Sequence, residues 1–275
     1  MVRAMILDYS QYETEATSTG IVNFISVGNE KPFFIHDKTC PFCSIPTKIV
    51  YEKQKKDYPE WLAGSFDQCE YVYQCPNCGW WEYKYKNQSD AILDGIRASD
   101  IRYSSAIIKR FSENSAEVPI SALRIHLQKH PEAIYEIDAH KMEDLVRSVF
   151  SDYYPSCKVL SFGKTRDGGK DALLVDDNGD QFFIQIKRRS SPNATEGVGQ
   201  LTAFIGATII NDNVKGRIFV STADHYSRDA EKYARTVVQK QIVESFELID
   251  CKRFLTMVDI ARNKIPDYWR QLLQL

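Results

Sequence analysis

The sequence predicts an α/β protein, in which a mixed sheet flanked by helices follows a smaller, cysteine-rich N-terminal part. Three observations support this fold class. From about residue 137 the hydrophobic pattern runs helix, three strands, helix, strand, which is typical of a mixed sheet with helices packed on it. Two C-x-x-C pairs lie among aromatic residues and Pro/Gly turns between residues 38 and 86. Apolar residues at helical spacing separate these regions. We expect an N-terminal module over 1–88, a helical connector over 89–134 and an α/β domain over 135–275.

The composition is that of an ordinary globular chain. Its 275 residues are 43% hydrophobic and 26% charged, enough for one large or two modest domains. Thirty-five Lys+Arg against 37 Asp+Glu leave a net charge of -2, which excludes a bulk-basic protein that coats nucleic acid without specificity. The best apolar run, 203–210, is far shorter than the roughly 18 residues of a membrane span. The N-terminus turns polar before a secretory signal could form. We expect a cytoplasmic protein without membrane contact.

Four of the seven cysteines form two C-x-x-C pairs, Cys40 with Cys43 and Cys75 with Cys78. Two residues between cysteines let a tight turn aim both thiolates at one ion, and two such pairs complete a tetrahedral zinc site. The odd cysteine total argues against a disulfide framework, and the lack of a βαβ context argues against a redox motif. We therefore expect structural zinc in a zinc-ribbon module. Residues 44–74 separate the pairs by more than an ordinary ribbon does, which predicts an insertion near 51–68.

The rest of the N-terminal half is less regular. Alternating residues predict short strands over 21–27, 70–74 and 81–86. The second cysteine pair is followed by a group of aromatic residues, Trp80, Trp81, Tyr83 and Tyr85. These rings could stack on single-stranded bases or fill a small core around the metal, and the area that each ring buries favours the core. In the connector, two apolar stripes predict helices, one through Ile92, Ile96 and Ile101 and one through Ile120, Leu123 and Leu127 after Pro119.

The C-terminal half alternates helices and strands without interruption. The expected helices cover 139–152, 196–211, 226–239 and a segment after residue 251, and the expected strands cover 157–160, 171–175, 181–187, 216–222 and 246–250. The sequence Asp177-Asn178-Gly179 predicts a tight hairpin turn between the second and third strands.

Polar residues gather where two of these strands end. Asp171 opens the second strand, and Gln185 and Lys187 close its hairpin partner, so we expect them side by side on one face. Glu143, beside the apolar stripe of the first helix, could aim its carboxylate at the same cluster. Carboxylate and amide oxygens suit Mg²⁺, and Lys187 could orient or deprotonate a metal-bound water. An Asp near a Gln-x-Lys is common in exposed hairpins, and the order of helix Glu, strand Asp and strand Gln-x-Lys is what favours catalysis.

The segment from about 135 to 258 resembles the Mrr-like type IV restriction endonucleases, a branch of the PD-(D/E)xK nuclease superfamily. Five stretches in the same order support the resemblance: HKMEDLV at 140–146, TRDGGKD at 165–171, FIQIKR at 183–188, GRIFVST at 216–222 and FELID at 246–250. The resemblance implies a restriction-endonuclease-like αβββαβ core and cleavage of DNA phosphodiesters that depends on a divalent metal, Mg²⁺ or Mn²⁺.

The resemblance also implies roles for individual residues. Asp171 and Gln185 would ligate the metal, with Gln185 standing where most relatives have Glu, as is typical of this branch. Lys187 would be the catalytic lysine and Glu143 the helix acid. Gln in place of Glu removes one ligand charge, which weakens metal binding unless Glu143 compensates. Lys170 departs from the family, which commonly has a small or apolar residue before the Asp, and alternation should turn it away from the cluster.

Arg188 and Arg189 follow the lysine and run into a turn that could reach a phosphate backbone, although a plain solvated strand end explains them equally well. The role of Gln200 on the next helix is left open.

We expect an endonuclease acting on double-stranded DNA, and the resemblance suggests restriction of foreign or modified DNA. The alternatives are a catalytically silent DNA- or protein-binding module on the same fold, or a nuclease for branched DNA or RNA. Because a duplex cutter needs two active sites or two visits, a homodimer is expected.

Overall fold

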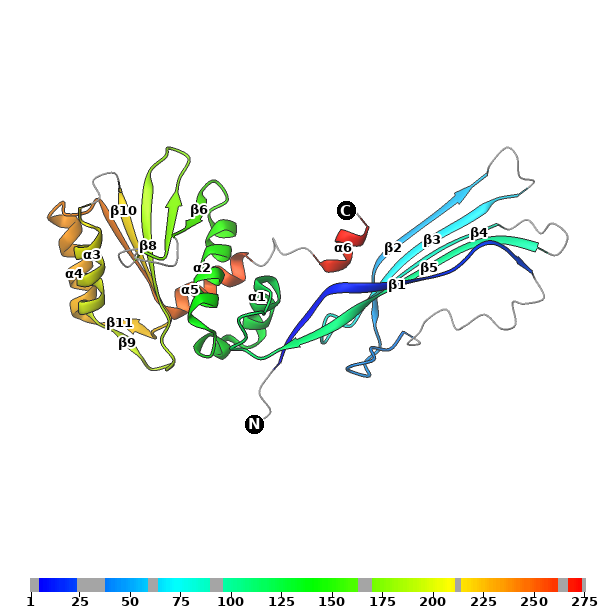
Figure 1. Cartoon of the computed structure of the whole chain (residues 1–275), viewed down its shortest axis with the longest axis horizontal. Coiled ribbons are helices and arrows are strands. Elements are labelled where there is room, and N and C mark those ends of the chain that lie inside the picture. The colour runs from blue at the N-terminus through cyan, green and yellow to red at the C-terminus, as the bar shows by residue number, and fades with distance from the viewer. Residues whose placement is uncertain are drawn as a thin grey trace. The chain divides into compact units, whose positions relative to one another are not determined.

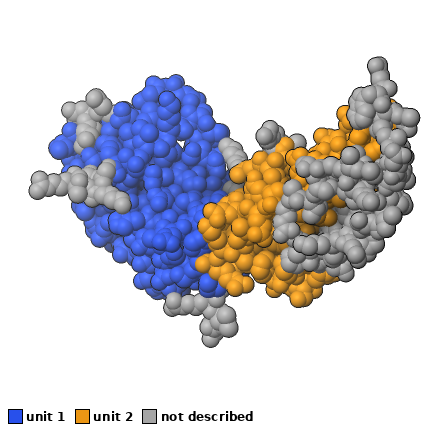
Figure 2. All heavy atoms as spheres, turned by 45° about the vertical axis from the view of Figure 1, so that its right-hand side comes forward, with its two compact units in different colours: residues 1–6, 111–265 blue, residues 7–110, 266–275 orange. Residues whose placement is uncertain are grey.

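The computed structural model describes residues 5–23, 38–58, 64–89, 96–162, 170–210, 214–261 and 267–273. Its contacts divide the chain into two compact units (Figure 2). The α/β unit consists of Met1–Ile6 and Phe111–Ile265, and the β unit consists of Leu7–Arg110 and Pro266–Leu275. The chain therefore passes twice through each unit. The division falls after Arg110, whereas the sequence predicted boundaries near residues 88 and 134.

The β unit is built on a five-stranded sheet with the order β1-β5-β4-β3-β2 (Figure 1). The pairs β2/β3, β3/β4 and β4/β5 are antiparallel. The strands are β1 (Ile6–Asn23), β2 (Lys48–Asp57), β3 (Phe66–Gln74), β4 (Trp81–Ser89) and β5 (Ile96–Phe111). The short helix α6 (Tyr268–Leu272) also belongs to this unit, and the ring of Trp269 lies 5.8 Å from that of Tyr51. The unit is thus larger than the zinc-ribbon module expected from the cysteines.

The tryptophans of β4 and the preceding turn fill the core of the β unit. Trp80 and Trp81 are 2% and 1% exposed. The indole N–H of Trp80 donates to the carbonyl of Ala106 at 2.9 Å, and that of Trp81 donates to the carbonyl of Tyr9 at 3.2 Å. These bonds satisfy the polar edge of each ring inside the core. The core interpretation is confirmed for both tryptophans, and the two tyrosines that follow on β4 are half-buried.

The predicted helix over Ile96 and Ile101 is wrong, because this segment is strand β5. Residues 99–105 pair with β4 in antiparallel register, so that Tyr103 lies opposite Lys84. Pairing with a neighbouring strand overrides a weak apolar stripe at helical spacing. Ile92 lies outside the described residues, as do residues 24–27 of the predicted strand 21–27. The segment expected as an insertion near 51–68 contributes to the β2–β3 hairpin of the sheet.

The α/β unit contains a five-stranded mixed sheet with the order β12-β10-β8-β7-β6. Strands β6, β7 and β8 are antiparallel, and β10 is parallel to both β8 and β12. The strands are β6 (Lys158–Ser161), β7 (Ala172–Val175), β8 (Gln181–Lys187), β10 (Gly216–Ser221) and β12 (Ser245–Ile249). A second, two-stranded sheet pairs β9 (Thr195–Glu196) with β11 (His225–Tyr226). The predicted mixed sheet flanked by helices is confirmed.

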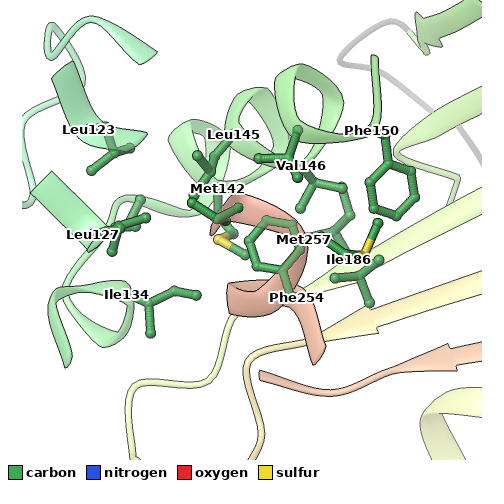
Figure 3. Packing of buried hydrophobic residues seen from close by; sticks show 14 of the residues in the cluster. Leu123, Leu127, Ile134, Met142, Leu145, Val146, Phe150, Ile186, Phe254 and Met257 are labelled. Carbon is green, nitrogen blue, oxygen red and sulfur yellow. The ribbon is translucent and has the colours of Figure 1, made fainter. Parts of the chain in front are cut away.

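Helices cover both faces of this sheet (Figure 1). One face packs on α1 (Ile120–Lys129), α2 (Ala139–Tyr153) and α5 (Cys251–Ile260), and the other packs on α3 (Val198–Thr208) and α4 (Arg228–Gln239). A single-turn helix, η2 (Pro131–Tyr135), joins α1 to α2. Figure 3 shows the first core, where the apolar stripe of α2 meets α5 and strand β8. None of the described helices is long and apolar enough to cross a membrane.

Two local features determine where α2 begins and where the β7–β8 hairpin turns. The side chain of Asp138 accepts hydrogen bonds from the N–H groups of His140 and Lys141, which caps α2 at its N-terminus. In the predicted hairpin turn, Gly179 has a φ of 82°, a left-handed conformation that glycine adopts without steric cost. Alternation along β8 is as predicted: Ile184 and Ile186 enter the α2/α5 core and Phe183 enters the α3/α4 core.

Candidate active site and cysteine cluster

The carboxylate of Asp171 lies against strand β8, one residue before β7 begins. Its backbone N–H donates to the carbonyl of Ile184 at 2.9 Å, which extends the β7–β8 pairing by one residue. Its Oδ2 accepts a hydrogen bond from the N–H of Ile186 at 2.6 Å and lies 3.4 Å from Nε2 of Gln185. The structure thus brings together two of the predicted site residues, Asp171 and Gln185.

Gln185 presents its amide nitrogen to Asp171, and it is only 6% exposed. In this orientation the amide is a donor to the carboxylate. A half-turn about its last bond would exchange Nε2 and Oε1 and direct an oxygen to the same place. An amide oxygen beside a carboxylate is a donor set for a hard divalent cation. The pair is therefore compatible with the predicted ligand roles.

Glu143 lies close enough to Asp171 for their charges to interact. Burial, and after it the charge of Asp171, raises the pKa of Glu143 above its ordinary value. Its Oε1 lies 3.7 Å from Nδ1 of His140, one turn earlier on α2. Two neighbouring carboxylates repel each other unless a proton or a cation is shared, so the predicted helix acid adds to a site that favours a cation.

Lys187 ends strand β8 two residues beyond Gln185, on the same face by alternation. It lies opposite Ser221 in the parallel pairing with β10, and it is half-buried. Among the described residues, none forms an ion pair with its ammonium. Lys170, which departs from the family pattern, places its ammonium over the rings of Phe162 and Phe183, 5.5 and 4.8 Å from the centroids. That residue has a packing role beside the site.

The two arginines that follow Lys187 have acceptors inside the α/β unit. Arg188 donates from Nη1 to the backbone carbonyl of Tyr135 at 2.8 Å. Arg189 forms a bidentate ion pair with Glu196, a carboxylate without exposed surface. Sequence reasoning missed Glu196, which no motif or periodicity distinguishes. The predicted contacts of both arginines with DNA stay predictions, as does any role for Gln200, which is exposed on α3.

The four cysteines of the C-x-x-C pairs converge in the β unit. Their Sγ atoms all lie within 4.8 Å of one another, and those of Cys40 and Cys78 are 3.6 Å apart. Four thiolates at the usual distance of about 2.3 Å from one zinc ion would be roughly 3.8 Å apart. Within the part of the chain that the structure describes, no other group of three or more Cys, His, Asp or Glu residues meets so closely. The cluster could hold one metal ion.

Both pairs fold into the same tight turn, which explains why they can share an ion. The N–H of Ser44 donates to the carbonyl of Cys40 at 2.9 Å, and the N–H of Gly79 donates to that of Cys75 at 3.0 Å. Ser44 and Gly79 both have positive φ, 54° and 88°. The turn closes after each C-x-x-C and aims its two thiols inward, as their spacing predicts.

Burial acts on two of the groups at the centre of the cluster. Burial raises the pKa of the Cys78 thiol to about 12. Burial and the neighbouring Cys78 also raise the pKa of the Tyr9 phenol, which sequence reasoning did not connect with the cysteines. A bound divalent ion displaces thiol protons, and its binding energy then stabilises the fold around it.

Part of the α/β unit matches a known protein family. Residues 134–258 match the family model Mrr_cat, described as restriction endonuclease. No curated protein is significantly similar in sequence. A solved ATP-dependent Type ISP restriction-modification enzyme, LlaBIII bound to DNA, shares 15% identity at a TM-score of 0.31, over 48% of this chain and 8% of that one. A repair endonuclease from Pyrococcus abyssi shares 11% identity at a TM-score of 0.24, over 67% of this chain and 79% of that one.

Both structural likenesses are too weak to support a conclusion about function, and the chain spans only a small part of the first enzyme. The family match is of a different kind, because it covers the segment that contains Glu143, Asp171, Gln185 and Lys187. It also covers α2, the mixed sheet and most of α5. Residues 134–258 of this chain therefore match the restriction endonuclease domain that this family model describes.

Proposed function

We propose that the α/β unit is an endonuclease that hydrolyses DNA phosphodiester bonds with a divalent metal ion. The observation that carries this proposal is the meeting of Asp171 and Gln185 at the ends of β7 and β8, with Lys187 two residues further on. These groups lie within a restriction endonuclease domain. Double-stranded DNA is the proposed substrate, and restriction of foreign or modified DNA is the proposed role.

Each residue has a role that its position supports. Asp171 and Gln185 would hold Mg²⁺ or Mn²⁺, with Glu143 supplying the negative charge that Gln185 lacks. When bound, such an ion polarises the attacked phosphate and lowers the pKa of a water ligand. Lys187, without an ion-pair partner among the described residues, would as an ammonium orient the attacking water and offset charge on the phosphate, or as a neutral amine accept the proton of that water. Arg188 and Arg189 would contact the DNA backbone only by giving up or sharing their present acceptors.

For the β unit we propose a structural zinc ion bound by Cys40, Cys43, Cys75 and Cys78. The separation of the four Sγ atoms fits tetrahedral thiolate ligation. A zinc ion would tie the start of β2 to the β3–β4 turn, since the two cysteine pairs flank these strands. None of the seven cysteines, which all lie in the described part of the chain, forms a disulfide, and this fits a reducing cytoplasm. A homodimer that cuts both strands is also proposed, because one active site cuts one strand at a time.

Plasmid cleavage tests the nuclease proposal. Methylated and unmethylated supercoiled plasmid would be incubated with wild type, Asp171→Ala and Lys187→Ala, with Mg²⁺ or Mn²⁺ and with chelator. We expect nicking or linearisation by wild type with metal only, and its loss in both variants. A wild type that never nicks any plasmid, and whose behaviour Lys187→Ala leaves unchanged, would instead indicate a catalytically silent binding module. Cleavage confined to branched DNA or RNA in a parallel substrate panel would assign a different nuclease substrate.

A further inference from the structure

A buried acid lies beside the end of strand β8 that carries Lys187. Glu196, the second residue of β9, has no exposed surface. Its Oε2 accepts hydrogen bonds from Oγ of Ser221 at 2.7 Å and from Nε of Arg189 at 3.0 Å, and its Oε1 accepts from Nη2 of Arg189 at 2.5 Å. Ser221 is the residue of β10 opposite Lys187. The carboxylate of Glu196 thus binds both Ser221, which lies opposite Lys187, and Arg189, two residues after Lys187.

The backbone at the end of β8 is also held by a second set of hydrogen bonds. The N–H of Thr222 donates to the carbonyl of Lys187 at 3.0 Å. The hydroxyl of Thr222 accepts from the N–H of Arg189 at 2.6 Å and donates to its carbonyl at 3.0 Å. Glu196 is itself anchored, because its carbonyl accepts from the N–H of Ser227 at 2.9 Å. The β8–β10 pairing is thereby continued past the strand ends to residue 189.

Stability alone does not explain an ion pair in this place. A buried carboxylate loses its hydration, and apolar residues of similar volume often stabilise a fold as well as a buried ion pair does. What the ion pair adds is a fixed orientation of the backbone at the end of β8. The planar guanidinium of Arg189 fits the carboxylate in one bidentate geometry, and that geometry fixes the chain immediately after Lys187. Lys187 itself has no ion-pair partner among the described residues that could fix its direction.

We propose that Glu196 is a positioning residue for Lys187: by holding Arg189 and Ser221 it sets the end of β8 from which the lysine reaches the scissile phosphate. The proposal rests on the nuclease function proposed above. It also gives Arg189 an inward role in place of a contact with DNA. Catalysis depends on the placement of such groups to within about an ångström, and a misplacement of that size costs on the order of 100-fold in rate.

Steady-state cleavage kinetics test the proposal with Glu196→Gln, which keeps the shape of the side chain and removes its charge. Glu231→Gln is the matched control, because Glu231 is half exposed on α4 and pairs with Arg235. We expect Glu196→Gln to lower kcat by about 10- to 100-fold, while KM and the Kd for metal-free DNA binding stay within about twofold of wild type. The control should match wild type. Thermal unfolding of each variant shows that it is folded.

The results separate this proposal from the function on which it rests. If wild type does not cleave, the nuclease function fails. If wild type cleaves and Lys187→Ala does not, while folded Glu196→Gln cleaves at the wild-type kcat, only the positioning role is overturned. A rise in KM or Kd with an unchanged kcat would also overturn it, and would assign the pair to DNA binding. Should Glu196→Gln not fold, Ser221→Ala removes one bond to the carboxylate, and it is expected to lower kcat by a smaller factor.

Discussion

Asp171 and Gln185 face each other across the β7–β8 hairpin, with Oδ2 and Nε2 3.4 Å apart. The relationship follows from the strand register: Ala172 pairs with Ile184, so the preceding residue of one strand meets the next residue of the other. The turn at Gly179 fixes that register. A hairpin turn about eight residues away in sequence therefore decides which polar groups meet at the proposed metal site.

Asp171→Asn keeps the size of the side chain and removes the carboxylate charge. If Asp171 holds the metal, cleavage should fall on the order of 10³-fold, because metal stabilisation of the transition state is worth several kcal/mol. Plasmid nicking at saturating Mg²⁺ measures this. Asp180→Asn is the control, since Asp180 lies at the other end of the same hairpin and pairs with Lys215. Wild-type nicking by Asp171→Asn would rule out a ligand role.

Gln185→Glu adds the ligand charge that most relatives are expected to have. Without metal, a carboxylate at this buried position would repel Asp171 and lower thermal stability. With Mg²⁺ the extra charge should strengthen binding, so we expect half-maximal cleavage at an Mg²⁺ concentration about tenfold lower. Melting temperatures with and without Mg²⁺, together with cleavage titrations, check both effects. Gln181→Glu, at the start of the same strand, should change neither.

The parts of the fold that could be predicted are those that depend on the local pattern of residues in the sequence. The stripe of α2, the alternation of β8 and the turn at Gly179 each depend on neighbours in sequence, and each was found as predicted. Asp171 and Gln185 could be paired in advance because a single tight turn joins their strands.

The missed parts depend on distant contacts. Strand β5 is set by pairing with β4, and α6 is a helix of five residues that is anchored by the burial of Trp269 in the β unit. Glu196 bonds to Ser221, which is 25 residues away. In sequence, a buried acid of this kind cannot be distinguished from a solvated one. Its role can be inferred only from the structure, where the ends of β8, β9 and β10 meet.

Acid should destabilise the α/β unit through His126. Burial lowers the pKa of His126 below its ordinary value of 6.5, and this outweighs the hydrogen bond that Nε2 of His126 makes to the Glu113 carboxylate at 3.2 Å, which raises the pKa. The neighbouring His130 lowers it and Glu132 raises it. Because the folded state favours neutral His126, its contribution to stability is complete above the unfolded pKa. It is lost as pH falls through that value toward the folded pKa.

His126→Gln should therefore flatten the pH dependence of stability below about pH 6.5. The free energy of unfolding in urea at about pH 7.5 and about pH 5.5 gives this slope directly. His225→Gln serves as control, since the His225 side chain is 58% exposed and lies on β11, away from α1. An unchanged slope in His126→Gln would assign the acid sensitivity to other groups.

Removing one thiol of the cysteine cluster should release the metal and unfold the β unit. We expect about one zinc per wild-type chain by elemental analysis, and its loss in Cys75→Ala, because structural zinc sites of this kind contribute on the order of 10 kcal/mol to folding. All four tryptophans of the chain fall within the β unit, so their fluorescence reports on that unit alone. Cys69→Ala is the matched control, a half-buried cysteine on β3 outside the cluster. If Cys75→Ala retains zinc and the wild-type fluorescence transition, the cluster is not the metal site, because a fourth thiolate that can be deleted without effect is not a ligand.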